Sequence, residues 1–189
     1  MRLFQILALA TLIASLSASP ARAEGFITPY IGFNFGGDSA NCAAFSNCEE
    51  KRTNWGVTFG STQGIFGIEA DFGYAPHFFG DIPDHPNGVF HFMTDLMVLV
   101  PAGPVQPYAF VGIGLIRPHA TFDVSSLSSL DQNAFGHDLG GGLNLFFAHK
   151  VGLHGEVRHL RTFKDVTLGV FSHDKLDFWR ASAGLTFRF

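Results

Sequence analysis

The charged residues that could form a site are spaced two apart in several segments of the sequence. Glu69 and Asp71 are separated by one residue, as are Glu156 and Arg158. Residues two apart lie on the same face of a β-strand. Carboxylates and guanidiniums in an enclosed space must pair with one another or with water, because an isolated buried charge is costly. We therefore predict a network of interior charges. It comprises Glu69, Asp71, Asp95, Asp138, Glu156, Arg158 and Arg180, with Arg188 on the same side.

Two of these arginines are expected to be neighbours. Counting back from the loop before the last segment places Arg158 opposite Arg180, with Glu156 diagonal to Arg180. Two adjacent guanidiniums should attract carboxylates from other strands. Two interpretations stay open: a fixed network that plugs the interior, or ion pairs that exchange partners and gate a narrow pore.

Catalysis and metal binding have weaker support in the sequence. A catalytic nucleophile needs an adjacent base and a group that orients it, and Ser182 with Glu156 shows no such third member. The spacing of His77, His85 and His91 matches no known metal site. We therefore expect no catalytic residue, no metal site and no cofactor.

The closing segment, W-R-A-S-A-G-L-T-F-R-F at 179–189, shows which elements position these charges. Its apolar residues alternate strictly with polar or small ones, which is typical of a strand with two unlike faces. Lipid on one side and a polar interior on the other would explain both faces. Seven earlier segments alternate in the same way. They are 27–35, 55–61, 65–75, 89–100, 107–116, 134–147 and 151–161.

The connections between these segments alternate between long and short. Long ones follow the first, third, fifth and seventh segments, as in a meander that crosses a membrane with short inner turns and long outer loops. Such a sheet must close, because an open edge would leave backbone groups unpaired in lipid. The sequence predicts an all-β fold, an eight-stranded antiparallel up-and-down transmembrane β-barrel. A soluble lipocalin-like barrel is the alternative, but its interior should be apolar.

The N-terminal residues predict export. A basic start, an apolar run and a small-x-small pattern ending at Ala23 are typical of a cleaved signal peptide, so we expect 1–23 to be the signal and 24–189 the barrel domain. In an oxidising compartment Cys42 and Cys48 are expected to form a disulfide. A metal pair is the alternative, although no histidine is near. The mild net charge of −4 argues against nucleic-acid binding.

Three cationic side chains fall on the side assigned to lipid. His137, His159 and Arg161 are expected near the outer rim, with His137 close to Arg161. A cation deep in lipid costs roughly 2–4 kcal/mol, and the cost falls toward zero at the interface. The three residues are therefore either an interfacial girdle or a contact for lipopolysaccharide phosphates.

The order of these segments resembles the small eight-stranded outer-membrane β-barrel family, the OmpA/OmpX type. G-I-E-A-D-F-G-Y at 67–74, P-Y-A-F-V-G-I-G-L at 107–115 and the closing strand carry the resemblance. It implies a monomer in the outer membrane of a Gram-negative bacterium, surrounded by lipid and lipopolysaccharide. It also implies recognition by periplasmic chaperones and the barrel-assembly machinery, with Trp179, Phe187 and Phe189 as the assembly signal.

The resemblance further implies a structural or surface-interaction role without catalysis. A lipid-modifying barrel, such as a lipid A acyl hydrolase or transferase, and a narrow pore are the alternatives. The chain departs from the OmpA pattern because a peptidoglycan-binding domain is not expected after the barrel.

Overall fold

The computed structural model describes residues 23–37, 39, 52–78, 87–120, 130–131, 133–168 and 171–189. In this part of the chain, eight long strands and one two-residue strand, β6, are found. They are β1 (Glu24–Phe35), β2 (Arg52–Gln63), β3 (Phe66–Pro76), β4 (Asn87–Leu99), β5 (Val105–Ala120), β6 (Leu130–Asp131), β7 (Ala134–Ala148), β8 (Val151–Leu168) and β9 (Phe171–Arg188).

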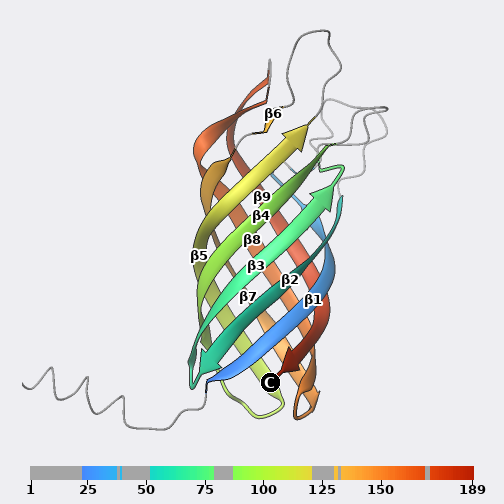
Figure 1. Ribbon diagram of the computed structural model, residues 1–189, viewed down its shortest axis with the longest axis vertical. Coiled ribbons are helices and arrows are strands. Elements are labelled where there is room, and N and C mark those ends of the chain that lie inside the picture. The colour runs from blue at the N-terminus through green and yellow to red at the C-terminus, as the bar shows by residue number, and fades with distance from the viewer. Residues whose placement is uncertain are drawn as a thin grey trace, which may run out of the picture.

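The long strands close into a single antiparallel barrel (Figure 1). Each long strand pairs with the next long strand along the chain, so that β5 pairs with β7, while the short β6 lies beside β5. β1 pairs with β9 to complete the ring. At the seam, Gly25 N donates to Phe189 O at 3.2 Å and Phe189 N donates to Gly25 O at 3.0 Å. The predicted eight-stranded barrel is therefore confirmed.

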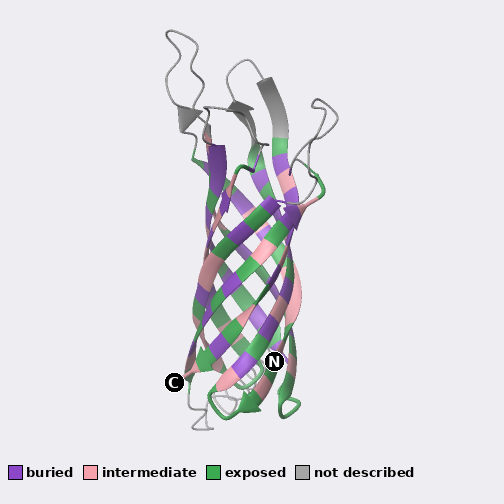
Figure 2. Cartoon of the chain, turned by 90° about the vertical axis from the view of Figure 1, so that its right-hand side faces the viewer, coloured by how far each residue is buried: buried purple, intermediate pink, exposed green. Residues whose placement is uncertain are grey.

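Alternation along each strand separates an outer from an inner face (Figure 2). In β4, Met93, Asp95 and Met97 are buried, whereas Leu96 and Val98, which alternate with them, are exposed. Large apolar side chains exposed on the outer face include Ile68, Val111, Ile113, Leu139 and Leu153. Such a surface is unfavourable in water and suits contact with lipid. Among the described residues, no helix has the length and apolar character of a membrane-spanning helix.

The two ends of the barrel differ in their connections. Two residues join β2 to β3 and two join β7 to β8, and both turns lie at the end where the C-terminus emerges (Figure 1). Gly64 between β2 and β3, and Gly103 between β4 and β5, have φ of 63° and 68°, which favours glycine. The longer connections lie at the opposite end, as the sequence predicts for outer loops.

The last predicted long loop, 162–176, is wrong. β8 continues to Leu168 and β9 begins at Phe171, so this hairpin extends beyond the predicted strands. β5 likewise runs to Ala120, past the predicted start of a loop at Arg117. These extensions carry polar residues that break the apolar alternation. Backbone pairing needs no lipid-facing side chains, so the strands continue where the pattern stops, with two register irregularities between Arg161 and Val166.

The inside of the barrel is layered. One apolar cluster includes Phe78, Leu160, Leu176 and Phe178 and lies toward the end with the long connections. A second cluster lies toward the short turns and comprises Phe26, Met97, Leu99, Tyr108 and Phe110. Buried charged residues occupy the space between them. A filled interior is the usual state of an eight-stranded barrel.

Candidate functional site

Two arginines form the centre of the barrel interior. Arg158 in β8 and Arg180 in β9 are direct register partners and are 0% and 1% exposed. Each occupies an inward position of a strand whose alternate residues face outward. The guanidinium carbon of Arg158 lies 4.0 Å from the centre of the Phe110 ring, and that of Arg180 lies 4.5 Å from the centre of the Tyr30 ring. These aromatic faces support the cations on their apolar sides.

Arg158 binds carboxylates from four different strands. Its Nη2 donates to Glu69 Oε1 at 2.8 Å, and its Nη1 donates to Asp95 Oδ2 at 2.6 Å. Its Nε donates to Glu156 Oε1 at 3.0 Å, and Nη1 also contacts Asp138 Oδ2. This one side chain therefore ties β3, β4 and β7 to β8 across the lumen.

Arg180 binds a second, overlapping set of acids. Its Nη1 donates to Asp71 Oδ2 at 2.7 Å, and its Nη2 donates to Glu156 Oε1 at 2.8 Å. Glu156 thus bridges the two arginines. The structure places all seven residues of the predicted network inside the barrel and joins them through these contacts.

Neutral side chains complete the network. Thr58 donates to Asp71 Oδ1 at 2.9 Å, and the Tyr108 hydroxyl donates to Glu156 Oε2 at 2.9 Å. His91 Nε2 lies 2.9 Å from Asp71 Oδ2, and Arg180 Nη1 donates to the Tyr30 hydroxyl at 2.5 Å. These four residues were not predicted as members of the network. Alternation in the sequence places them on the inward face. It does not tell how far along the barrel axis they lie, and so it could not assign them to the network.

The arrangement holds charge in place and offers little for catalysis. Ser182 is the register partner of Glu156, but its Oγ is buried without a hydrogen-bond partner. A serine without a base is not activated as a nucleophile. Of the three histidines considered for a metal, His91 lies in the network, His77 follows β3, and His85 lies outside the described residues. Within the described ranges, no three potential ligands are grouped around a metal position.

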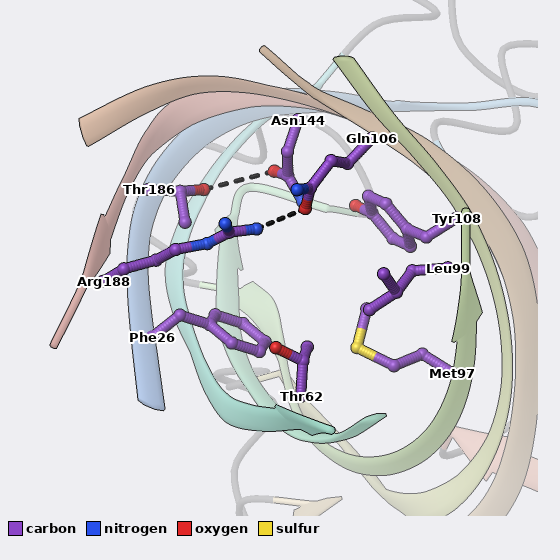
Figure 3. A pocket seen from close by; sticks show the side chains of 9 residues that line it. All are labelled: Phe26, Thr62, Met97, Leu99, Gln106, Tyr108, Asn144, Thr186 and Arg188. Carbon is purple, nitrogen blue, oxygen red and sulfur yellow. Dashed lines mark hydrogen bonds between the residues drawn. The ribbon is translucent and has the colours of Figure 1, made fainter. Parts of the chain in front are cut away.

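Arg188 lies apart from the network, in a pocket at the short-turn end (Figure 3). Its Nη2 bonds to Gln106 Oε1, and its Nη1 lies 3.6 Å from Glu24 Oε2. Its guanidinium also stacks on the Phe146 ring at 3.6 Å. Phe26, Met97 and Leu99 form the apolar side of this pocket.

The three predicted lipid-side cations gather near the other end. His137 and Arg161 are register partners, as expected from the sequence. Asp177 accepts from this group: its Oδ1 lies 2.6 Å from His159 Nε2, and its Oδ2 lies 3.5 Å from Arg161 Nε. His137 stacks on Phe163, and His159 packs against Trp179. The acid compensates part of the positive charge, while 47% of the Arg161 side chain stays exposed.

The residues predicted as an assembly signal all lie on the outer face of β9 or directly after it. Trp179, Phe187 and Phe189 are 38%, 39% and 76% exposed. Trp179 lies toward the long connections, and the other two lie at the short-turn end. Cys42 and Cys48, the predicted disulfide, lie outside the described residues.

The sequence matches the model of one protein family. Residues 8–189 match the model described as outer membrane protein beta-barrel domain. The search of curated proteins returned no match.

Solved structures share the fold at low sequence identity. Neisserial surface protein A has a TM-score of 0.65 at 13% identity, with 88% of this chain and 97% of that chain covered. Ail from Yersinia pestis, in complex with the heparin analogue sucrose octasulfate, has a TM-score of 0.55 at 12% identity, with 87% and 99% covered. The outer membrane protein W from E. coli has a TM-score of 0.52 at 19% identity, with 90% and 100% covered.

Proposed function

The chain belongs to the outer membrane protein beta-barrel domain family, and from that premise we propose that it is a sealed, non-catalytic barrel that supports the envelope and presents its outer connections for surface contacts. It is an integral protein of the Gram-negative outer membrane. In that membrane the barrel stabilises the envelope, and it neither conducts solutes nor modifies lipid.

The observation that carries this proposal is the layered interior. A path along the lumen would meet an apolar cluster, then the cross-linked charges, then a second apolar cluster. Opening it would require separating Arg158 from acids on three other strands. Breaking a buried charge pair costs about 3–5 kcal/mol, which favours a plug over ion pairs that exchange partners.

Among the described residues no activated nucleophile is found, which argues against the alternative of a lipid-modifying enzyme. An enzyme acting on lipid A would need its reactive group within reach of the outer leaflet. Ser182 instead points into the lumen beside Glu156, and its Oγ has no base. The outer face near the rim carries His137, His159 and Arg161 around Asp177, in which hydroxyl or thiol nucleophiles do not take part.

We propose that this rim group contacts lipopolysaccharide phosphates. Arg161 is half exposed and has only a 3.5 Å contact with Asp177, so part of its guanidinium can meet an anionic headgroup. Replacing His137, His159 and Arg161 with Ala should lower the lipopolysaccharide that co-purifies with the barrel. Arg117→Ala, at another exposed arginine, is the control. An unchanged amount in the triple variant would refute this contact.

A deletion strain tests the main proposal. Loss of the protein should raise sensitivity to detergents, and the wild-type gene should restore resistance. The lipid A mass spectrum and the entry of a small hydrophilic dye should be the same with and without the protein. A new lipid A species that depends on the protein would favour the enzyme. Dye entry that rises with expression would favour the pore.

A further inference from the structure

The charges of the buried network do not balance. Among the described residues of the network, five carboxylates share two guanidiniums: the acids are Glu69, Asp71, Asp95, Asp138 and Glu156, and the cations are Arg158 and Arg180. All seven are nearly or fully buried between the two apolar clusters. An uncompensated buried carboxylate is costly and gains a proton instead.

Two of these acids meet over a glycine. Asp95 in β4 and Asp138 in β7 are both register partners of Gly112 in β5, which lies between them. Neighbouring strands are about 4.8 Å apart, so a side chain on β5 would normally separate them. Both Oδ1 atoms instead lie within 2.6 Å of the position that a β-carbon on Gly112 would occupy.

The oxygens that meet have no other partner. Asp95 Oδ1 and Asp138 Oδ1 are buried and receive no hydrogen bond from any described group. Their Oδ2 atoms both bind Nη1 of Arg158. Two ionised carboxylates have no hydrogen to place between them. In Asp71, by contrast, Oδ1 accepts from Thr58 and Oδ2 accepts from Arg180.

We propose that Asp95 and Asp138 form a proton-binding site, in which one proton is shared between their Oδ1 atoms above Gly112. A metal ion fits the site less well, because two oxygens are far fewer than the six or more that hard cations take. The shared proton lowers the buried negative charge and supplies the missing hydrogen bond. The inference does not depend on the proposed function, since a sealed barrel could hold this pair in either protonation state.

The site predicts how barrel stability changes with pH. The groups that face the pair are Arg158 and Glu156 from β8, Glu69 from β3, and, around Arg180, Asp71 from β3 with His91 from β4. A carboxyl in the unfolded chain loses its proton at about pH 4, whereas the pair in the folded barrel keeps one. The shared proton should therefore stabilise the barrel most in mild acid, and this stabilisation should be lost progressively as the pH rises from about 4 until the pair is fully ionised.

Asparagine at one member of the pair tests this prediction. In Asp138→Asn, the amide can donate to Asp95 Oδ1 as the shared proton does. Urea unfolding in detergent should then give a wild-type midpoint at about pH 5, without the decrease that the wild-type midpoint shows as the pH rises from about 5 to 8. Asp71→Asn is the matched control, because both of its oxygens already have donors. It should lower the midpoint at every pH and keep the wild-type slope.

Two results would overturn the proposal. One is an Asp138→Asn midpoint that is lowered as much as that of Asp71→Asn and falls with pH in parallel with the wild type. The other comes from infrared spectroscopy of the wild type, which needs no variant that folds. A protonated-carboxyl band should be present at about pH 6, where ordinary carboxyls are ionised, and its absence would contradict a shared proton. A lumen that is shown to conduct would refute the plug and leave this band unaffected.

Discussion

Arg158 is the side chain on which the interior charges converge. It is fully buried and contacts Glu69, Asp95, Asp138 and Glu156. Arg158→Ala would leave these acids without their shared cation, so the free energy of unfolding should fall by about 3–5 kcal/mol. Urea titration in lipid vesicles measures this. Arg161→Ala, at a half-exposed arginine on the outer face, is the control and should cost at most about 1 kcal/mol. Equal losses would contradict the assigned role of Arg158.

Gly112 is required for the acids to meet. A β-carbon there would collide with the carboxyl groups of Asp95 and Asp138 and with Thr94 O. Gly112→Ala should therefore lower the unfolding free energy by about 1–3 kcal/mol, as overpacking does. Gly155→Ala is a matched control, because a β-carbon at that strand position meets nothing within 4 Å. If both variants unfold at the same urea concentration, the close approach over Gly112 is wrong.

At this scale the sequence allowed the acids and arginines to be found, because period-two spacing assigns each to a face. The register of Arg158 with Arg180 also followed from counting along the chain. The close approach of Asp95 and Asp138 could not be predicted in this way. It depends on the registers of β4, β5 and β7 together and on a residue without a side chain between them.

The closing strand β9 is the element that completes the barrel. Its last residue bonds through its backbone to Gly25 and exposes its ring on the outer face. We predict that deleting Phe189 impairs insertion while export continues, so the protein should accumulate in the periplasm. Fractionation and immunoblotting measure this. Phe147→Ala removes another exposed aromatic ring near the short turns and should insert normally. Wild-type outer-membrane levels of the truncated protein would refute the assembly role of Phe189.

The ends of the strands could be predicted only where the strand faces lipid, because only there must its outward side chains be apolar. Between 134 and 147 the alternation predicted β7 to within one residue of its observed end. β8 and β9 continue to Leu168 and from Phe171 because their backbones keep pairing beyond the lipid-facing part, and charged residues such as Lys164 and Lys175 interrupt the apolar pattern there. Register irregularities in this hairpin also leave no mark in the sequence.

The whole molecule is a ring in which every long strand has two neighbours. A closed barrel held by this ring should resist detergent without heat, because no strand edge is available for unfolding to begin. We predict that unheated and boiled samples migrate differently in detergent gels. Equal migration would count against closure. Arg158→Ala should lower the temperature at which the two bands interconvert.

Closure could be predicted from alternation and connection lengths, since an open sheet edge is not tolerated in lipid. The layering of the interior could not. Whether an inward residue joins an apolar cluster or the charge network depends on its height, which strand tilt and register set together. Phe178 and Arg180 are both inward residues of β9, yet one packs on Phe78 in the apolar cluster and the other binds Asp71.

The most direct test of the sealed lumen is current recording from the purified protein in a planar lipid bilayer. The two apolar clusters and the cross-linked charges between them predict no steady conductance above that of the bare membrane. Refolding into vesicles, confirmed by the gel shift, shows that the sample contains closed barrels. Discrete, long-lived current steps from such a sample would contradict the account.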